Sequence, residues 1–451
     1  MLYGRLSNAH NGLPPGPKLS PKAQALKWIG QPYEFLRDCA GTFGDAFTLD
    51  MGLEDGKYVV LSHPDAVRGI VTADVGALKV CNNVLSPLLG PRSLLLLDGE
   101  EHLRGRKLLM PAFQHRSIAA YADIIHRVLS AATAHWSEGS VFVAQEFLQD
   151  VALEVILRVT FGEDAADRCG ALKAALMAVL NDPRLGLAVL GRAGESGTLP
   201  ALGAFWQKFE RVRDLALALV EQARSESPGP SNTILSLLLQ AKDESGSSRT
   251  DEELRDEVLT LLVTGHETTA TAMSWGLYWL TQLSEPRERL RSELATLGRA
   301  SDPMAIAQLP YLDATCKEIL RIYPIVPALF RQVIGGSFKL CGYAFEPGTF
   351  LSPSIYLTHH RPELYPDPDR FDPPRFLARA YSPYEYLPFG GGPRRCVGMH
   401  LAIFEMKVVL AALFDRYEFA LVKGQNVAPA RRFVTVAPGE RLQLAVAEVR
   451  S

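Results

Sequence analysis

The sequence predicts a mainly α-helical fold with small β-sheets. Apolar residues recur at helical spacing over most of the chain, and the short strand-like runs do not alternate with helices as βαβ units. A doubly wound dinucleotide-binding fold is therefore excluded. No linker, low-complexity tract or block of charge divides the 451 residues, so we expect one large domain over residues 1–451.

The first third of the chain predicts a strand pair followed by helices. A polar tail and a proline-rich hinge occupy residues 1–17. A short helix is predicted over 32–40, and strands over 46–52 and 58–61 around the turn 54–56. Helical periodicity then predicts helices over 99–110, 117–136, 143–160, 168–180 and 201–225.

A long helix is predicted to begin after Thr250, because Thr250 and Glu253 have the spacing of a capping box. If it runs toward the breaker Pro286, it spans roughly 50 Å at 1.5 Å per residue. Within it, residues 258–283 are apolar enough to cross a bilayer, but the charged Glu267 near the centre would be costly in lipid. We therefore expect a buried central helix of a large protein.

The last third predicts one more helix, short strands and an irregular segment. The helix covers 312–323 and stops before Pro324. Strand patterns follow at 337–340, 349–354, 417–422 and 442–449, and a proline-rich stretch leads into a glycine-rich loop.

Composition limits the function and the location. The net charge of −3 and the 22% charged content argue against a nucleic-acid partner. Six scattered cysteines fit a reducing compartment, and the short polar stretch before Pro14 has no signal-peptide pattern. We expect a soluble, cytoplasmic protein without a membrane anchor.

The loop that contains Cys396 carries the strongest chemical signal. Three glycines and two arginines precede this cysteine, and a helical apolar pattern begins at Met399. The positive end of a helix dipole and nearby arginines favour a thiolate, which is a metal ligand or a nucleophile. Three consecutive glycines suggest a flat group against the backbone, and haem accepts a thiolate as axial ligand.

Other interpretations of this loop are weaker. A phosphate-binding loop would need Gly-Lys-Ser/Thr, and no lysine is present in it. A catalytic cysteine of the protease type needs a general base but neither a glycine triplet nor flanking arginines. A structural cysteine in a turn is the remaining alternative.

The pattern Phe-x-x-Gly-x-Arg-x-Cys-x-Gly, here Phe389, Gly392, Arg394, Cys396 and Gly398, resembles the haem-binding signature of the cytochrome P450 family of haem-thiolate monooxygenases. The resemblance extends over nearly the whole chain. It implies the cytochrome P450 fold, with haem b (iron protoporphyrin IX) between the long central helix and the cysteine-loop helix, and Cys396 as the proximal metal ligand.

The segment Thr264-Gly265-His266-Glu267-Thr268 resembles the oxygen-activating segment of the family. Glycine inside a helix costs about 1 kcal/mol, so Gly265 suggests close approach of the porphyrin or of dioxygen. The resemblance implies that Glu267 and Thr268 are catalytic, a carboxylate for proton delivery beside a hydroxyl that holds an oxygen atom. Taken alone, Thr268 bonding its own helix backbone would be the simpler interpretation.

Two residues of this segment, His266 and Thr264, need separate interpretation. A zinc-protease motif fails, because its second histidine would fall at Ala270. Thr264 departs from the family pattern, where alanine or glycine is usual. Its side chain either narrows the pocket above the iron or bonds the carbonyl of Thr260, and the sequence leaves both open.

Glu318 and Arg321 form a Glu-x-x-Arg pattern, which places opposite charges on one helical face. By itself this pattern is usually a solvated pair. It resembles the core pair of the family, joined by an arginine in a Pro-x-Arg-Phe stretch, here Arg375. The resemblance implies a buried network that supports the segment presenting Cys396.

Basic residues provide donors for the two haem propionates. His102 and Arg106 match the propionate-binding pair of the family on an early helix, and Arg331 and Arg394 match further contacts. Four nearby basic residues are interpreted as part of a basic surface that binds an acidic electron donor, namely Arg104, Lys107, Arg395 and Lys407. We interpret His359 and His360 as structural.

The resemblance implies a monooxygenase that hydroxylates or epoxidises an apolar small molecule, such as a fatty acid, terpenoid, steroid or polyketide. By resemblance the substrate meets the loop 84–97, the region 185–205, the long helix, residues 325–330 and the tip 433–435, which are rich in apolar residues. O2 is the co-substrate, a separate ferredoxin and its reductase supply electrons, and the protein is expected to be a monomer. A peroxide-driven enzyme and a non-catalytic haem protein are the alternatives.

Overall fold

The computed structural model describes residues 12–52, 56–163, 166–182, 184–185, 203–226, 233–298, 302–432, 434–439 and 441–450. Contacts between residues divide the chain into two compact units. The first comprises residues 1–81, 314–396 and 426–440, and the second comprises residues 82–313, 397–425 and 441–451. The prediction of a single domain over the whole chain stays a prediction.

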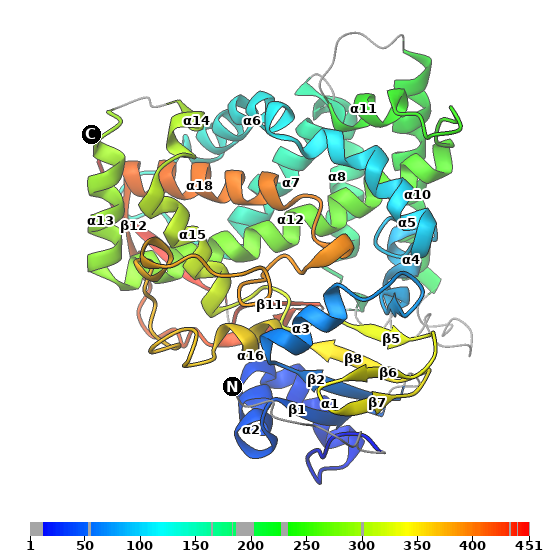
Figure 1. The fold of residues 1–451 in the computed structure, drawn as a ribbon. Coiled ribbons are helices and arrows are strands. Elements are labelled where there is room, and N and C mark those ends of the chain that lie inside the picture. The colour runs from blue at the N-terminus through cyan, green and yellow to red at the C-terminus, as the bar shows by residue number, and fades with distance from the viewer. Residues whose placement is uncertain are drawn as a thin grey trace. The chain divides into compact units, whose positions relative to one another are not determined.

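The first unit contains the largest sheet and short helices around it (Figure 1). Its elements are α1 (Pro21–Gly30), α2 (Pro32–Phe43), β1 (Ala46–Asp50), β2 (Lys57–Leu61), α3 (Pro64–Val71), β3 (Leu78–Val80), β5 (Arg331–Val333), β6 (Phe338–Leu340), β7 (Tyr343–Phe345), β8 (Phe350–Pro353), α16 (Ile355–His359), α17 (Arg375–Ala378), η5 (Gly392–Arg394), β10 (Pro429–Arg432) and β11 (Thr435–Pro438).

The strand pair predicted near the start of the chain is confirmed. Strands β1 and β2 pair antiparallel, with Ala46 opposite Leu61 and Asp50 opposite Lys57. The sheet continues in the order β1-β2-β8-β5-β3, in which β2 and β8 are parallel. Because β8 comes from the last third of the chain, this sheet joins distant segments into one unit.

Aromatic residues form the core beside this sheet. The ring of Tyr33 stacks on that of Tyr356 with centroids 4.1 Å apart, and on that of Tyr323 at 5.8 Å. The Tyr33 hydroxyl donates to the carbonyl of Pro324 at 2.7 Å. Helix α2 is thereby fixed to the end of α15 (Pro310–Ile322), whose residues belong to both units.

The second unit is mostly helical and has one small sheet in the order β4-β12-β9. Its other elements are η1 (Asn83–Leu85), α4 (Ser86–Leu89), α5 (Gly99–Leu109), η2 (Met110–Phe113), α6 (His115–Thr133), β4 (Val141–Val143), α7 (Ala144–Phe161), α8 (Ala166–Leu180), α10 (Gly203–Ser225), α11 (Ile234–Gln240), α12 (Asp251–Gln282), α13 (Ser284–Ala295), α14 (Pro303–Ile306), α18 (Met399–Arg416), β9 (Tyr417–Leu421) and β12 (Gln443–Val449).

Helix α12 is the predicted long helix. The Thr250 hydroxyl accepts from the amide of Glu253, and the Glu253 carboxylate accepts from the amide of Thr250, which confirms the capping box. The 32-residue helix is about 48 Å long. It ends at Gln282, and Pro286 lies in the first turn of the next helix, α13.

The apolar stretch of α12 is buried in protein, as expected. Residues from Leu254 to Leu280 are largely inaccessible, and α7, α10 and α18 pack against the helix (Figure 1). Among the described residues, no helix is both long enough and apolar enough to span a bilayer.

Short elements account for most of what the sequence analysis did not predict. Helix α3 is an example, although its signals are present: His63 caps it, Pro64 is its first residue, and Val67 and Ile70 are buried. Strands of three or four residues, such as β3 and β5, are too short to show an alternating pattern.

The Glu-x-x-Arg pair is buried, as the resemblance implied. The Arg321 side chain donates from Nε to Glu318 Oε2 at 2.6 Å and from Nη2 to Oε1 at 2.8 Å, and both side chains have 0% exposure. The Nε of Arg375 donates to Glu318 Oε1 at 3.2 Å. The amide of Asp372 also donates to this oxygen at 2.8 Å, so one carboxylate joins α15 to the segment after Arg370.

Removal of this carboxylate should destabilise the protein strongly. Glu318→Ala is expected to lower the free energy of unfolding by about 3–5 kcal/mol, because it leaves the buried Arg321 guanidinium without its counter-charge and removes one of the two carboxylates that pair with Arg375. Chemical unfolding measures the effect.

Helix α10 provides a matched control, because Glu210 and Arg213 have the same Glu-x-x-Arg spacing but Glu210 is 53% exposed. Glu210→Ala is expected to cost less than about 1 kcal/mol. Equal losses for the two variants would contradict the structural role of Glu318.

Candidate functional site

The cysteine loop is a compact turn ahead of α18. The amide of Cys396 donates to the carbonyl of Phe389 at 2.9 Å, and the amide of Arg395 donates to that of Gly392 at 3.1 Å. Helix α18 begins at Met399 with Gly398 as its N-cap, so Cys396 lies two residues before the cap. All six cysteines lie in the described part of the chain, and Cys396 is the exposed one.

The glycines of this loop have a packing reason that the sequence did not show. A Cβ atom on Gly392 would lie 1.9 Å from the carbonyl oxygen of Val71 in α3, and the φ of Gly392 is +62°. A Cβ on Gly391 would lie 3.1 Å from the Val71 side chain. Close approach to α3 therefore explains these glycines without a flat ligand, and the case for haem depends on the cysteine and the basic residues.

His359 connects the buried ion network to the start of the cysteine loop. Its carbonyl accepts from Arg321 Nη1 at 2.9 Å, and its Nε2 accepts from the amide of Leu387 at 2.9 Å. Burial, together with the positive charge of Arg321, lowers the pKa of His359 to about 3, so the ring is neutral and Nε2 remains an acceptor. The structural interpretation of His359 is confirmed, and its connecting role was missed.

The basic residues predicted to hold propionates occur in both units. In the first unit Arg331 begins β5, where it donates from Nη1 to the carbonyl of Phe330 at 2.8 Å, and Arg394 ends η5. In the second unit His102 is buried and Arg106 half-buried on α5. In the first unit, the exposed Cys396 thiol and the guanidinium donors of Arg331 and Arg394 are groups that suit an iron porphyrin with anionic side groups.

The threonines of α12 bond their own helix. The hydroxyl of Thr264 donates to the carbonyl of Thr260 at 2.7 Å, which is the second of its two open interpretations. The hydroxyl of Thr268 donates to the carbonyl of Thr264 at 2.7 Å. A Cβ on Gly265 would lie 3.5 Å from Ile156 of α7, so the structure gives this glycine a helix neighbour and room for a methyl group.

Comparison with known proteins decides the family. The family model described as "Cytochrome P450" matches residues 14–444. The chain belongs to the cytochrome P450 family.

Individual relatives agree with this assignment. The chain is 34% identical over 444 residues to a putative cytochrome P450 135B1 of Mycobacterium tuberculosis, with 97% of this chain and 92% of the relative covered. It is 30% identical to a putative cytochrome P450 120 of Synechocystis, covering 92% and 93% of the two chains.

A solved structure described as "Retinoic acid bound cyanobacterial CYP120A1" is 27% identical, with a TM-score of 0.84, and 97% of this chain and 99% of that one are covered. The chain thus has the cytochrome P450 fold and is a haem-dependent monooxygenase.

Within this P450, α7 provides a partner for the acid that the sequence analysis missed. The Nε2 of Gln149 donates to the Glu267 carboxylate, and one helical turn away Gln145 donates from Nε2 to Thr271 Oγ1 at 3.0 Å. Both glutamines have 4% exposure. Two glutamines at i and i+4 among the apolar residues of the buried face of α7 were the available signal.

We expect Gln149→Leu to lower the free energy of unfolding by about 1 kcal/mol, because the half-buried Glu267 carboxylate loses one hydrogen-bond donor. The loss should disappear in a Glu267→Leu background, as a double-mutant cycle by chemical unfolding would show. Gln145→Leu is the matched control, and its effect should persist in that background. If Gln149→Leu costs the same free energy of unfolding in the wild-type and Glu267→Leu backgrounds, then Gln149 and Glu267 do not interact.

Helix α18 contains a buried acid, Glu405. The side chain is 4% exposed, and its Oε1 has no hydrogen-bond partner among the described residues. Burial raises the pKa of Glu405 to about 8. The folded protein therefore holds this proton more tightly than the unfolded chain, and the stability from this group is lost as the pH rises from about 4.5 to about 8.

Glu405→Gln should remove this pH dependence. At pH 7 the variant is expected to be more stable than wild type by roughly 3 kcal/mol, with the difference vanishing near pH 4.5. Chemical unfolding at a series of pH values measures it, and Glu448→Gln, at an exposed position, is the control. Parallel stability curves for wild type and Glu405→Gln would contradict an ionisable buried carboxyl.

The predicted basic surface is only partly present. Lys407 is not a surface residue: it is 8% exposed, and its Nζ donates to the carbonyl of Ala307 at 2.8 Å and pairs with Asp313 at 2.6 Å. This correction arises because the long side chain of lysine can cross a packed interface to reach acceptors. Arg104 and Lys107 are exposed but pair with Asp243 and Glu244.

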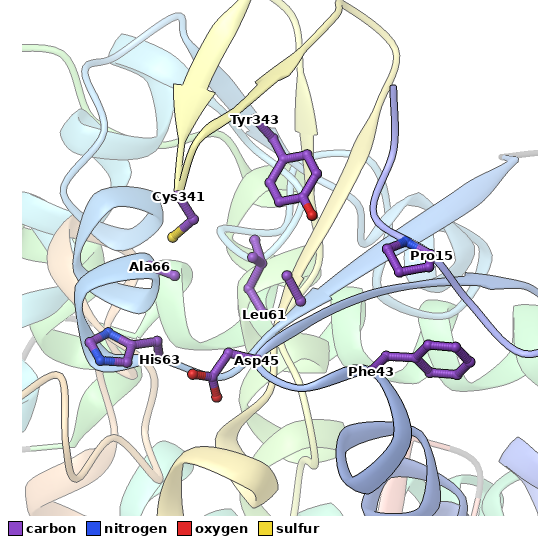
Figure 2. Close-up of a pocket in the computed structure, with 9 residues that line it drawn as sticks. Pro15, Phe43, Asp45, Leu61, His63, Ala66, Cys341 and Tyr343 are labelled. Atoms are coloured by element: carbon purple, nitrogen blue, oxygen red, sulfur yellow. The ribbon is translucent and has the colours of Figure 1, made fainter. Parts of the chain in front are cut away.

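Two of the predicted substrate-facing segments lie partly outside the described residues, namely 186–202 of the region 185–205 and residue 433 of the tip. A pocket of about 240 Å³ in the first unit is lined by none of the predicted site residues (Figure 2). Its lining includes Asp45, His63, Cys341 and Tyr343. The Asp45 carboxylate is already bonded to Ser62 and Arg361, so the pocket suggests no ligand.

Proposed function

We propose that this P450 hydroxylates or epoxidises an apolar small molecule with O2 and two electrons from a separate redox partner. The observation that carries the proposal is the exposed Cys396 thiol at the end of a closed loop, two residues before the N-cap of a long helix. The helix dipole and the neighbouring Arg394 and Arg395 favour its thiolate form.

The residues of the chain have separate roles in this proposal. Cys396 is the metal ligand, and His102, Arg106, Arg331 and Arg394 bind the propionates of haem b. Phe389, Gly392 and Gly398 shape the loop, and Gly265 leaves space on α12 for the porphyrin or dioxygen. The bound haem supplies O2 activation and insertion of one oxygen atom into a C–H bond.

Glu267 and Thr268 manage protons. The Glu267 carboxylate, oriented by Gln149, passes protons from solvent, and Thr268 Oγ1 receives them. To do so, the Thr268 hydroxyl would exchange its bond to the Thr264 carbonyl for a bond to the reacting oxygen.

Cys396→Ser tests the metal ligand. The variant should lose the characteristic spectrum of the reduced carbon-monoxide complex, because serine cannot supply the thiolate. Cys81→Ser, which changes a half-buried cysteine, should keep that spectrum. An unchanged spectrum in Cys396→Ser would assign the ligand elsewhere.

Thr268→Ala tests the proton path. We expect normal haem content but at least a severalfold fall in product per NADPH, with the electrons diverted to hydrogen peroxide. Thr268→Ser retains the hydroxyl and should restore much of the coupling. Equal coupling in wild type and Thr268→Ala would remove Thr268 from the mechanism.

The substrate class is proposed from the apolar segments and from a relative. The loop 84–97 and residues 325–330 are rich in Leu, Val, Ile, Pro and Phe. The solved relative binds retinoic acid, a long apolar carboxylic acid, which makes such acids the first compounds for a spectral-shift screen. Ferredoxin and its reductase are the proposed donors, and the cytoplasmic location and monomeric state stay predictions.

NADPH consumption with a ferredoxin system tests this activity. Product that depends on NADPH and O2 would support the monooxygenase. Ligand binding without any turnover would instead favour a non-catalytic haem protein.

A further inference from the structure

The beginning of α12 carries two adjacent buried acids that the proposed chemistry does not use. Asp256 has 0% exposure and Glu257 has 1%. Asp256 Oδ1 accepts from Arg255 Nε at 2.9 Å and from its Nη2 at 2.7 Å. Burial raises the pKa of Glu257, although the nearby Arg249 opposes this effect. Buried carboxylates are costly unless they are bonded, so their partners show what they position.

One set of partners belongs to the loop 84–97. The amide of Arg92 donates to Asp256 Oδ2 at 3.0 Å, and the amide of Leu94 donates to Glu257 Oε2 at 3.4 Å. Between them, the hydroxyl of the fully buried Ser93 lies 2.6 Å from that of Thr260. Three consecutive residues of the loop are therefore bonded to one face of α12.

Gly90 shows how closely the loop approaches this face. A Cβ atom on Gly90 would lie 2.2 Å from the carboxyl carbon of Asp256, and its φ is +83°. Any other residue would both clash and be strained. The loop is thus shaped for contact with Asp256.

A second set of partners leads to α5. The Nη1 of Arg249 pairs with Glu257 Oε2 at 3.5 Å, and its Nη2 donates to the carbonyl of Gly105 at 2.9 Å. Arg249 has a side-chain exposure of 9%. Gly105 lies on α5 between His102 and Arg106, so Glu257 reaches this helix through a single buried guanidinium group.

We propose that the acidic pair Asp256–Glu257 is a positioning element that fixes both the loop 84–97 and α5 to the beginning of α12. Glu257 is the shared point, because it meets the loop through Leu94 and α5 through Arg249. Thr260 and Asp256 act on the loop alone. The consequence for substrate and haem, a fixed substrate-facing loop and a fixed propionate-binding helix, rests on the proposed function.

Hydrogen exchange of the haem-loaded protein tests the positioning directly. Thr260→Val should speed exchange of the amides of residues 92–97 by about fivefold, the effect of one lost hydrogen bond, and leave α5 unchanged. Arg249→Leu should speed exchange in α5 and leave the loop unchanged. Glu257→Leu should affect both segments.

Thr264→Val is the matched control, because its hydroxyl makes the same bond to the carbonyl four residues earlier but has no bond to the loop. It should leave both segments as in wild type. The proposal is overturned if Thr260→Val leaves the loop unchanged, or if Arg249→Leu leaves α5 unchanged. These two variants decide the outcome even if Glu257→Leu fails to fold.

A second measurement separates this inference from the proposed function. Ligand dissociation constants from spectral shifts should rise severalfold in Thr260→Val, and haem transfer to an excess of a haem-accepting protein should be faster in Arg249→Leu. If exchange changes as expected while ligand and haem binding do not, the positioning role is supported and the substrate and propionate assignments fail.

Discussion

The position of the cysteine loop depends on the buried Glu318 carboxylate. This group neutralises Arg321 and Arg375 and accepts the amide of Asp372, so the segment around residues 370–375 is fixed to α15. From Arg321 the hydrogen bonds continue to the carbonyl of His359, and from the neutral His359 ring to the amide of Leu387, just before the loop. Removal of any member should lower the free energy of unfolding substantially, because a buried polar group would then lose a partner.

The polar residues of helix α12 fall into two groups, which differ in whether they bond to the helix itself or to other segments. Thr260, Thr264 and Thr268 each donate to the carbonyl four residues earlier, so their hydroxyls are satisfied within the helix itself. The acids, by contrast, bond to other segments: Glu257 to a loop amide and an arginine, and Glu267 to Gln149 of α7. A threonine is therefore available to change partner, whereas the acids define where neighbouring segments lie.

Local signals in the sequence predicted the long elements: the capping box at Thr250 and the strand pair after residue 46 are confirmed. The family resemblance, and not the bare Glu-x-x-Arg pattern, implied the buried partnership of Glu318 with Arg321 and Arg375, which is also confirmed. Features that depend on residues distant in sequence were not predictable. The glycines before Cys396 meet Val71, more than 300 residues earlier, and Lys407 reaches Ala307 and Asp313. Hydrophobic periodicity cannot predict such pairings, because it indicates only which face of a helix or strand is apolar.

Each unit thus contains its own buried charge network next to the residues proposed for function. In the first unit, Glu318 and two arginines support the segment that presents Cys396. In the second, Asp256 and Glu257 with Arg249 fix the loop 84–97 and the helix that carries His102 and Arg106. Apolar packing tolerates small shifts, whereas a buried ion with defined partners does not, because its hydrogen bonds weaken steeply with distance and angle. Charged networks are therefore suited to segments of irregular backbone, where no regular hydrogen-bond ladder would otherwise fix the position of a ligand.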